Sequence, residues 1–183
     1  MKITDLKCAV IGNNPVVRIV TDDGIDGFGE VESFKDYLKP HVIFYKDYIL
    51  GQDPTNVERV MMQIRRLGSF KPWGSAVSAI EMALWDIAGK AANLPVYKLL
   101  GGKVRDQVRV YNGAVRFPSR GVEPKHYAEN MAAMKEAPEG FTIIKQGVAF
   151  HGPMAQQVPN FYYGEVLPTG HRANRGLITE SGM

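Results

Sequence analysis

The chain lacks the features that would assign it to a specialised class of protein. Its single cysteine, Cys8, excludes a disulfide within these 183 residues and fits a reducing compartment, so we expect a cytoplasmic protein. No apolar run is long enough for a signal peptide or a membrane span, so we expect no membrane partner. The formal net charge is only +3, with basic and acidic residues interspersed, which gives no nucleic-acid footprint.

Motifs for several common chemistries are also missing. The sequence has no HExxH, no CxxC and no phosphate-binding loop, and its GFGEVE segment lacks the third glycine of a dinucleotide fingerprint. The overall composition, 45% hydrophobic and 22% charged, is that of an ordinary globular protein. The length suits one domain, or one small domain plus part of another.

Residues 1–32 predict a three-stranded antiparallel meander. Asn13-Asn14-Pro15 has turn chemistry, and Asp22-Asp23-Gly24 after a β-branched run is a hairpin signal. Gly27 and Gly29 fall inside the returning strand, where glycine indicates a bulge or the close approach of another backbone.

Helices are predicted to follow the meander. Residues 35–50 have near-helical apolar spacing, and Pro40 predicts a kink or a late start. For the next helix we expect Asp53 as the N-cap, Pro54 as the first residue and Gly68 at the end.

The clearest element is a long amphipathic helix over residues 75–92. Its apolar stripe comprises Ala76, Ala79, Ile80, Ala83, Leu84, Ile87 and Ala88. Most of these are alanine, so a neighbouring element can approach closely. Asn93 and Pro95 are expected to stop the helix, and Gly101-Gly102 indicates a domain boundary near residue 103.

Beyond residue 103 the pattern changes to strand, helix, strand. Residues 107–111 and 141–145 read as strands, and residues 124–137 have helical spacing. Such a βαβ unit implies a parallel sheet. We therefore expect one domain at 1–103 and part of a second at 104–183, ending in a long irregular loop.

Three motifs, in order, carry a family resemblance over about residues 1–147. They are TDDGIDGFGEVES, then LGQDP, then AIEMALWDIAGK with its PVYKLLGG end. Together they resemble the mandelate racemase and muconate lactonizing enzymes of the enolase superfamily. The resemblance implies an α+β capping domain, with a three-stranded antiparallel sheet plus helices, followed by the first βαβ portion of a (β/α) TIM-type barrel. Eight barrel strands do not fit after Gly102, so the barrel is incomplete in this chain.

The same resemblance implies a chemistry. The family abstracts a proton α to a carboxylate and stabilises an enediolate with Mg²⁺, whose three carboxylate ligands belong to barrel strands 3 to 5. We therefore expect no metal ligand in this chain, no metal-dependent activity from this chain alone, and either a fragment, a truncated product or a chain completed by another polypeptide. The partners implied are a small-molecule carboxylate and further copies in a homo-oligomer.

Lys145 is the catalytic residue that the resemblance predicts. Racemase-like members carry K-x-K at the end of the second barrel strand; the first lysine polarises the substrate carboxylate and the second is the general base. This chain reads Lys145-Gln146-Gly147, and Gly147 cannot accept a proton. The departure favours a lyase that dehydrates a sugar acid. A racemase or epimerase, a cycloisomerase and a non-catalytic capping-domain remnant stay open.

Four residues are predicted to bind substrate: Asn14, Phe34, Trp73 and Tyr162. The first two fall where the family's capping-domain specificity loops are expected, near residues 12–15 and 33–37. Trp73 lies in a glycine-flanked loop from which it could touch a substrate, although a role as a packing anchor explains it better. Tyr162 lies in the long loop, where mannonate-dehydratase-like members use a tyrosine in proton transfer.

Other polar residues have simpler explanations. Glu30 and Glu32 suit a solvated strand edge better than a metal pair. Salt bridges or helix capping explain Glu81 and Asp86 better than catalysis does. Lys145 itself would be an ordinary exposed lysine if the resemblance were set aside.

Overall fold

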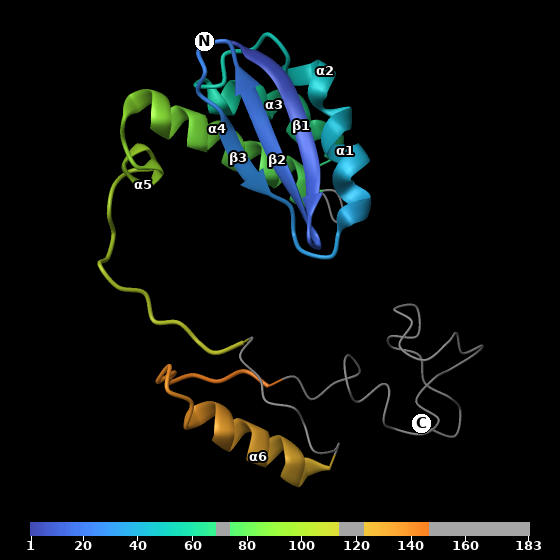
Figure 1. Ribbon diagram of the computed structural model, residues 1–183. Coiled ribbons are helices and arrows are strands. Elements are labelled where there is room, and N and C mark those ends of the chain that lie inside the picture. Colours follow the sequence, from blue (N-terminus) through green and yellow to red (C-terminus); the bar gives the residue numbers. More distant parts are fainter. Residues whose placement is uncertain (69–73, 114–122, 147–183) are drawn as a thin grey trace, which may run out of the picture. The chain divides into compact units, whose positions relative to one another are not determined.

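The computed structural model describes residues 1–68, 74–113 and 123–146 (Figure 1). The chain divides into two compact units, Met1–Asp106 and Gln107–Met183, and each is described by itself.

The first unit contains the predicted antiparallel meander. Strands β1 (Ile3–Ile11), β2 (Asn14–Thr21) and β3 (Gly27–Glu30) form one sheet in the order β1-β2-β3. The first turn differs from the prediction, because Asn14 and Pro15 pair with β1 and belong to β2. Gly12 explains the shift, because its positive φ of 62° is a conformation that glycine adopts easily. The chain therefore turns back at residues 12–13, one residue earlier than the asparagine pair suggests.

Short helical segments follow, then two longer helices on one side of the sheet (Figure 1). The elements are η1 (Asp36–Leu38), α1 (Lys39–Phe44), α2 (Lys46–Ile49), α3 (Val57–Gly68), α4 (Gly74–Ala92) and α5 (Val96–Leu99). Helix α4 packs on β2 and β3, and α3 packs on α4. Pro40 stands in the first turn of α1, as a late start requires.

The predicted start of α3 was wrong by three residues. Asp53 does not cap the helix, because its Oδ1 accepts hydrogen bonds from the Thr55 backbone N–H (3.0 Å) and hydroxyl (2.7 Å). This local Asx turn competes with helix formation, so α3 begins at Val57. Its end at Gly68 agrees with the prediction.

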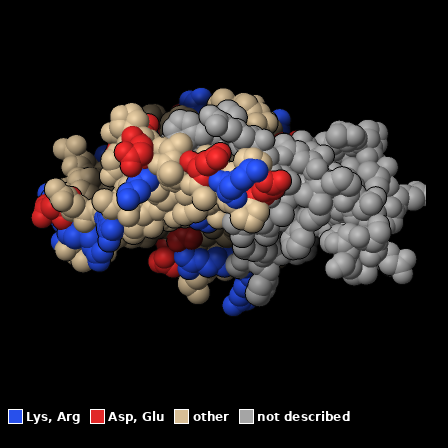
Figure 2. Space-filling model, turned by 90° about the horizontal axis from the view of Figure 1, so that it is seen from below, with Lys and Arg blue, Asp and Glu red and all other residues tan. Residues whose placement is uncertain are grey.

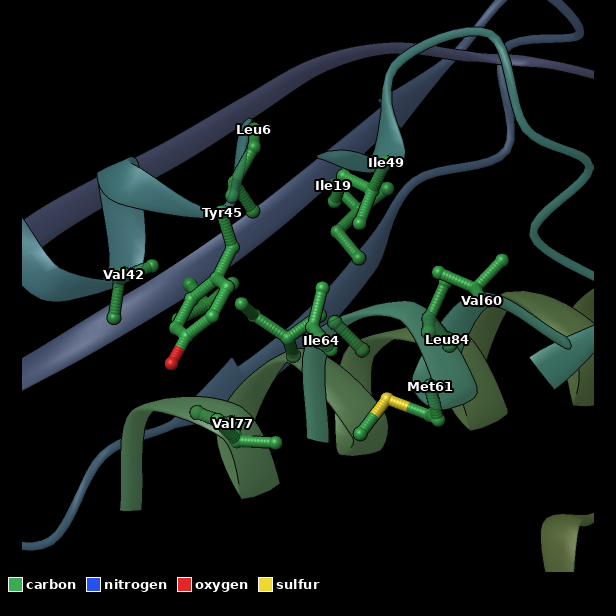
Figure 3. Packing of buried hydrophobic residues seen from close by; sticks show 14 of the residues in the cluster. Leu6, Ile19, Val42, Tyr45, Ile49, Val60, Met61, Ile64, Val77 and Leu84 are labelled. Atoms are coloured by element: carbon green, nitrogen blue, oxygen red, sulfur yellow. The ribbon is translucent and has the colours of Figure 1, made fainter. Parts of the chain in front are cut away.

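Helix α4 buries the whole predicted apolar stripe. Leu84 and Val77 from this helix belong to one apolar core (Figure 3). The same core contains Met61 and Ile64 from α3, Ile19 from β2, and Tyr45 from the α1–α2 junction. The helix ends where predicted: Asn93 adopts a positive φ of 51°, and the Leu94 N–H returns to the Gly89 carbonyl at 2.9 Å.

Strand β3 lies in direct contact with α4. A Cβ added at Gly29 would overlap the Ala79 carbonyl oxygen, and one at Gly27 would overlap that of Ala83. The glycines of the strand and the alanines of the helix therefore form one close-packed interface. The sequence prediction of a close backbone approach at these glycines is confirmed.

Within its described residues, the second unit contains the predicted helix but little sheet. Helix α6 spans Pro124–Lys135, with Pro124 in its first turn. The two predicted strands pair only through a single parallel bridge between Asn112 and Ile144. The parallel direction was correct, and the strand lengths at 107–111 and 141–145 were not. A pair of parallel segments has slanted, weaker hydrogen bonds and needs neighbours to form a longer ladder.

Candidate functional site: the lysine beside the parallel bridge

Lys145 follows the parallel bridge directly. The Asn112 N–H donates to the Ile143 carbonyl at 2.8 Å, and the Lys145 N–H donates to the Asn112 carbonyl at 2.9 Å. Asn112 is buried, with 2% of its surface exposed. The backbone of Lys145 is therefore fixed, and its side chain is exposed at the carboxyl end of the segment.

The Lys145 ammonium lies 5.7 Å from the centre of the Tyr111 ring. This is within the range of a cation–π contact. No ion pair to Lys145 occurs in the described parts of the chain. The positive charge is thus held by an aromatic face and is not neutralised there by a carboxylate.

Gln146 takes a different direction from its neighbour. The Asn130 side-chain amide on α6 donates to Gln146 Oε1 at 3.1 Å. Successive side chains of an extended segment alternate in direction, so the Gln146 contact with α6 agrees with Lys145 pointing elsewhere. Sequence reasoning missed Tyr111 and Asn130, because only the fold brings them to this segment.

In the first unit, the segments of Asn14 and Phe34 come together at one end of the sheet. The Phe34 N–H donates to the Asn13 carbonyl at 2.9 Å, which joins the β1–β2 turn to the loop after β3. The Asn14 amide donates to the Glu30 carboxylate. Phe34 has a φ of 63° and is 54% exposed, so a bulky side chain is presented from a strained backbone position.

Two predicted binding residues, Trp73 and Tyr162, lie outside the described residues, as does Gly147. Their predicted roles stay predictions.

The acidic side chains considered above have structural partners. Asp86 accepts a hydrogen bond from the Phe28 N–H (3.0 Å) and pairs with Lys90 (2.7 Å). Glu81 pairs with Arg65 at 2.9 Å, and Glu32 pairs with Lys35. Among the described residues, no group of three or more His, Cys, Asp and Glu side chains gathers to hold a metal ion.

His41 also has a structural environment. Its Nε2 lies 3.0 Å from the Tyr45 hydroxyl, and the end of α3 at Gly68 leaves no space for a Cβ beside them. Burial lowers the pKa of His41 and raises the pKa of Tyr45. The Tyr45 hydroxyl of this pair therefore lies against the end of α3.

Charged side chains of both signs are interspersed over the described residues on the face in Figure 2. No helix in the described ranges combines the length and the apolar character that crossing a bilayer requires.

Comparison with known proteins gives the family. Residues 10–101 match the model of the N-terminal domain of mandelate racemase / muconate lactonizing enzymes. The chain belongs to this family. The match spans β2, β3 and the helices from α1 to α5.

Relatives within and around this family extend the likeness. A D-galactonate dehydratase from Pectobacterium atrosepticum is 40% identical over 101 residues, which are 52% of this chain and 26% of that relative. A mandelate racemase/muconate lactonizing enzyme-like protein from Rubrobacter xylanophilus has a TM-score of 0.68 at 32% identity, over 91% of this chain and 46% of that one. An enolase from Agrobacterium radiobacter, bound to Na and L-malate, has a TM-score of 0.66 at 31% identity, over 90% and 41% of the two chains.

These matches give the fold class of the chain and show which part of its relatives it corresponds to. The first unit is the α+β capping domain of the enolase superfamily, and the chain corresponds to the N-terminal part of barrel-containing relatives. It spans about a quarter of the length of the curated relatives that it matches.

Proposed function

We propose that this chain serves, within a whole enzyme of the family, in the dehydration of a sugar acid. The reaction removes the proton α to the carboxylate, expels the β-hydroxyl as water, and leaves an enol that becomes a 2-keto-3-deoxy acid. The observation that carries the proposal is the Lys145 ammonium, fixed at a segment end by backbone hydrogen bonds and without a carboxylate partner among the described residues. The relatives named D-galactonate dehydratase give independent support.

Lys145 binds and polarises the substrate carboxylate in this proposal. An ammonium near the carboxylate stabilises the negative charge that develops there as the α-proton leaves. That interaction is stronger in the transition state than in the ground state, so it lowers the barrier to proton removal. The general base is not assigned, because Gly147 has no basic group.

The capping-domain residues have the role of substrate selection. Phe34 presents an exposed ring and Asn14 a polar amide from two segments that a backbone hydrogen bond joins. An apolar wall beside a hydrogen-bonding group suits a carbon chain that bears hydroxyls. Trp73 and Tyr162 are proposed contacts on the grounds of sequence alone.

Magnesium is the cofactor that the family resemblance implies. The described residues offer no fitting set of ligands, since no group of three or more His, Cys, Asp and Glu side chains gathers among them, and Glu81 and Asp86 pair with Arg65 and Lys90. No step above is therefore routed through a metal ion. We propose that the domain boundary lies near residue 103 and that the metal ligands belong to a complete barrel.

The test is an assay of the whole enzyme against a panel of sugar acids with Mg²⁺, with detection of the 2-keto-3-deoxy product. Lys145→Ala is expected to lower kcat/KM by about a hundredfold or more, because a charge contact to the reacting group is lost. Lys135→Ala is the matched control, since Lys135 is an exposed lysine in the last turn of α6.

Unchanged activity in Lys145→Ala would refute the role of this lysine. Exchange of the α-proton without water loss would point to a racemase or epimerase, and an isomeric cyclic product to a cycloisomerase. The isolated 183-residue protein is expected to show no Mg²⁺-dependent turnover, and turnover by it would contradict that part of the proposal.

A further inference from the structure

We propose that Tyr111 is a positioning residue for the Lys145 ammonium, and that Gly113 provides the space for the Tyr111 ring. The proposal deepens the function proposed above, because it names the group that orients the lysine of that site. It rests on two independent observations, the cation–π contact and the steric environment of Gly113.

The backbone aligns the two segments that carry these partners. The hydrogen bonds of Asn112 to Ile143 and Lys145, 2.8 and 2.9 Å, hold the segments in parallel. Tyr111 precedes the bridge on one segment and Lys145 follows it on the other, so the two residues lie diagonally across it. The contact between their side chains follows from this register and does not depend on a long loop.

Gly113 leaves space for the Tyr111 ring where it stands, and its backbone angle does not call for glycine. A Cβ at this position would lie 2.8 Å from Cε2 of Tyr111, closer than a real side chain tolerates. Its φ is not in the left-handed region that favours glycine. The sequence Tyr111-Asn112-Gly113 thus combines a ring, a buried bridge residue and an open space that receives the ring.

The physical consequence is pre-organisation of a flexible charge. A lysine head group sits on four rotatable bonds, and most of its rotamers would point away from any one ligand. An aromatic face restricts these rotamers because the ring quadrupole attracts the ammonium. The ring cannot neutralise the charge, so the ammonium stays able to bind a carboxylate. An acidic partner in the same place would compete with the substrate.

The decisive experiment observes Lys145 directly. The 183-residue protein is reductively methylated with ¹³C-formaldehyde, and the Lys145 signal is assigned from its loss in Lys145→Arg. We expect that signal to be shifted upfield by the Tyr111 ring current, to return to the position of other lysines in Tyr111→Leu, and to stay shifted in Tyr111→Phe.

Two further variants separate positioning from folding. Gly113→Ala displaces the ring and is expected to reduce the shift by half or more. Val108→Ala, at a 70% exposed residue of the same segment, is expected to leave it unchanged. An equal shift in wild type and Tyr111→Leu would overturn the proposal. Loss of the shift in Tyr111→Phe would also overturn it, because the hydroxyl and not the ring would then hold the lysine.

The functional arm uses the whole enzyme. Tyr111→Leu is expected to lower kcat/KM for the acid two- to tenfold, mainly through kcat, and Tyr111→Phe to restore it. In the Lys145→Ala background, Tyr111→Leu is expected to add no further loss. Additive losses would contradict positioning through Lys145. If no sugar acid is turned over, the function fails, while the methyl signal still decides the contact.

Discussion

The two units differ in how their hydrophobic residues are covered. In Met1–Asp106 the antiparallel sheet is covered by α4, on which α3 packs, and Leu6, Ile19 and Leu84 are fully buried. In the described part of the second unit, Met134 and Ala137 are the buried hydrophobic residues, and Val108, Val110 and Ile143 are exposed. The sequences of both units are apolar enough for a core, but only the first forms an extensive one within the described residues.

The difference shows that a stable sheet depends both on how its strands pair and on whether helices cover it. Antiparallel strands joined by short turns form a full ladder with local contacts, and a helix with an alanine face then packs on it. A parallel pair needs a crossover and neighbouring strands before it is stable. The proposed catalytic lysine lies in the less covered unit, whereas the proposed selective residues Asn14 and Phe34 lie in the well-covered one.

The largest effect is expected from filling the β3–α4 contact. Gly29→Ala would place a methyl group inside the Ala79 carbonyl, which belongs to a rigid helix, so we expect a loss of at least about 3 kcal/mol of unfolding free energy. Gly24→Ala is the control, with open space and a φ of 74°; its cost is about 1–2 kcal/mol. Urea unfolding followed by circular dichroism measures both. Equal losses of stability in the two variants would show that the contact between β3 and α4 does not determine the cost at Gly29.

Truncation of one buried residue in each unit sharpens the comparison further. Leu84→Ala is expected to cost about 2–5 kcal/mol, because the surrounding core cannot collapse into the space. Met134→Ala is expected to cost about 2 kcal/mol, at the low end of the same range, since its neighbours are less constrained. Hydrogen exchange measured by mass spectrometry provides the test. Backbone amides of residues 1–106 should lose protection in Leu84→Ala, and those of residues 123–146 in Met134→Ala. A larger loss from Met134→Ala would contradict the comparison.

The smallest effect concerns pH and the first unit alone. The Lys46 side chain, 2.6 Å from Asp5, is the main cause of a lowered pKa for that carboxyl. A lowered folded-state pKa stabilises the protein above the ordinary value of 3.8, and this contribution is lost as the pH falls through the folded-state pKa.

Asp5→Asn should therefore reduce stability at pH 7 and flatten its decline between about pH 5 and pH 3. Unfolding free energies measured across that range provide the test. Asp47→Asn, at an exposed carboxylate of α2, is the control. A decline in Asp5→Asn as steep as in wild type would exclude this ion pair as a source of acid sensitivity.

Much of the first unit could be predicted from local pattern. The meander, the apolar stripe of α4 and the stop at Asn93 depend on turn residues, periodicity and backbone angle, which the sequence contains directly. The errors at Asn14 and Asp53 arose where two local signals compete. Gly12 and Asn13 make the turn while Asn14 already pairs in β2, and the Asp53 carboxylate closes an Asx turn instead of capping a helix.

The candidate site was predictable only in part. The motif around Lys145 marks the lysine, because it follows a short apolar segment in a family pattern. No sequence motif points to Tyr111 or Asn130. Their relation to residues 145 and 146 depends on which segments pair and in which register, a non-local property that composition and periodicity do not encode.

By itself, then, the sequence determined the family, the three-stranded meander, the long helix α4 and the candidate lysine. Each depends on residues that are near one another in the chain. Only the tertiary structure decided that Gly29 meets Ala79, that Phe34 joins Asn13, and that the Lys145 ammonium lies over Tyr111. Those contacts join residues from about 20 to 50 positions apart, and the packing of whole elements selects them.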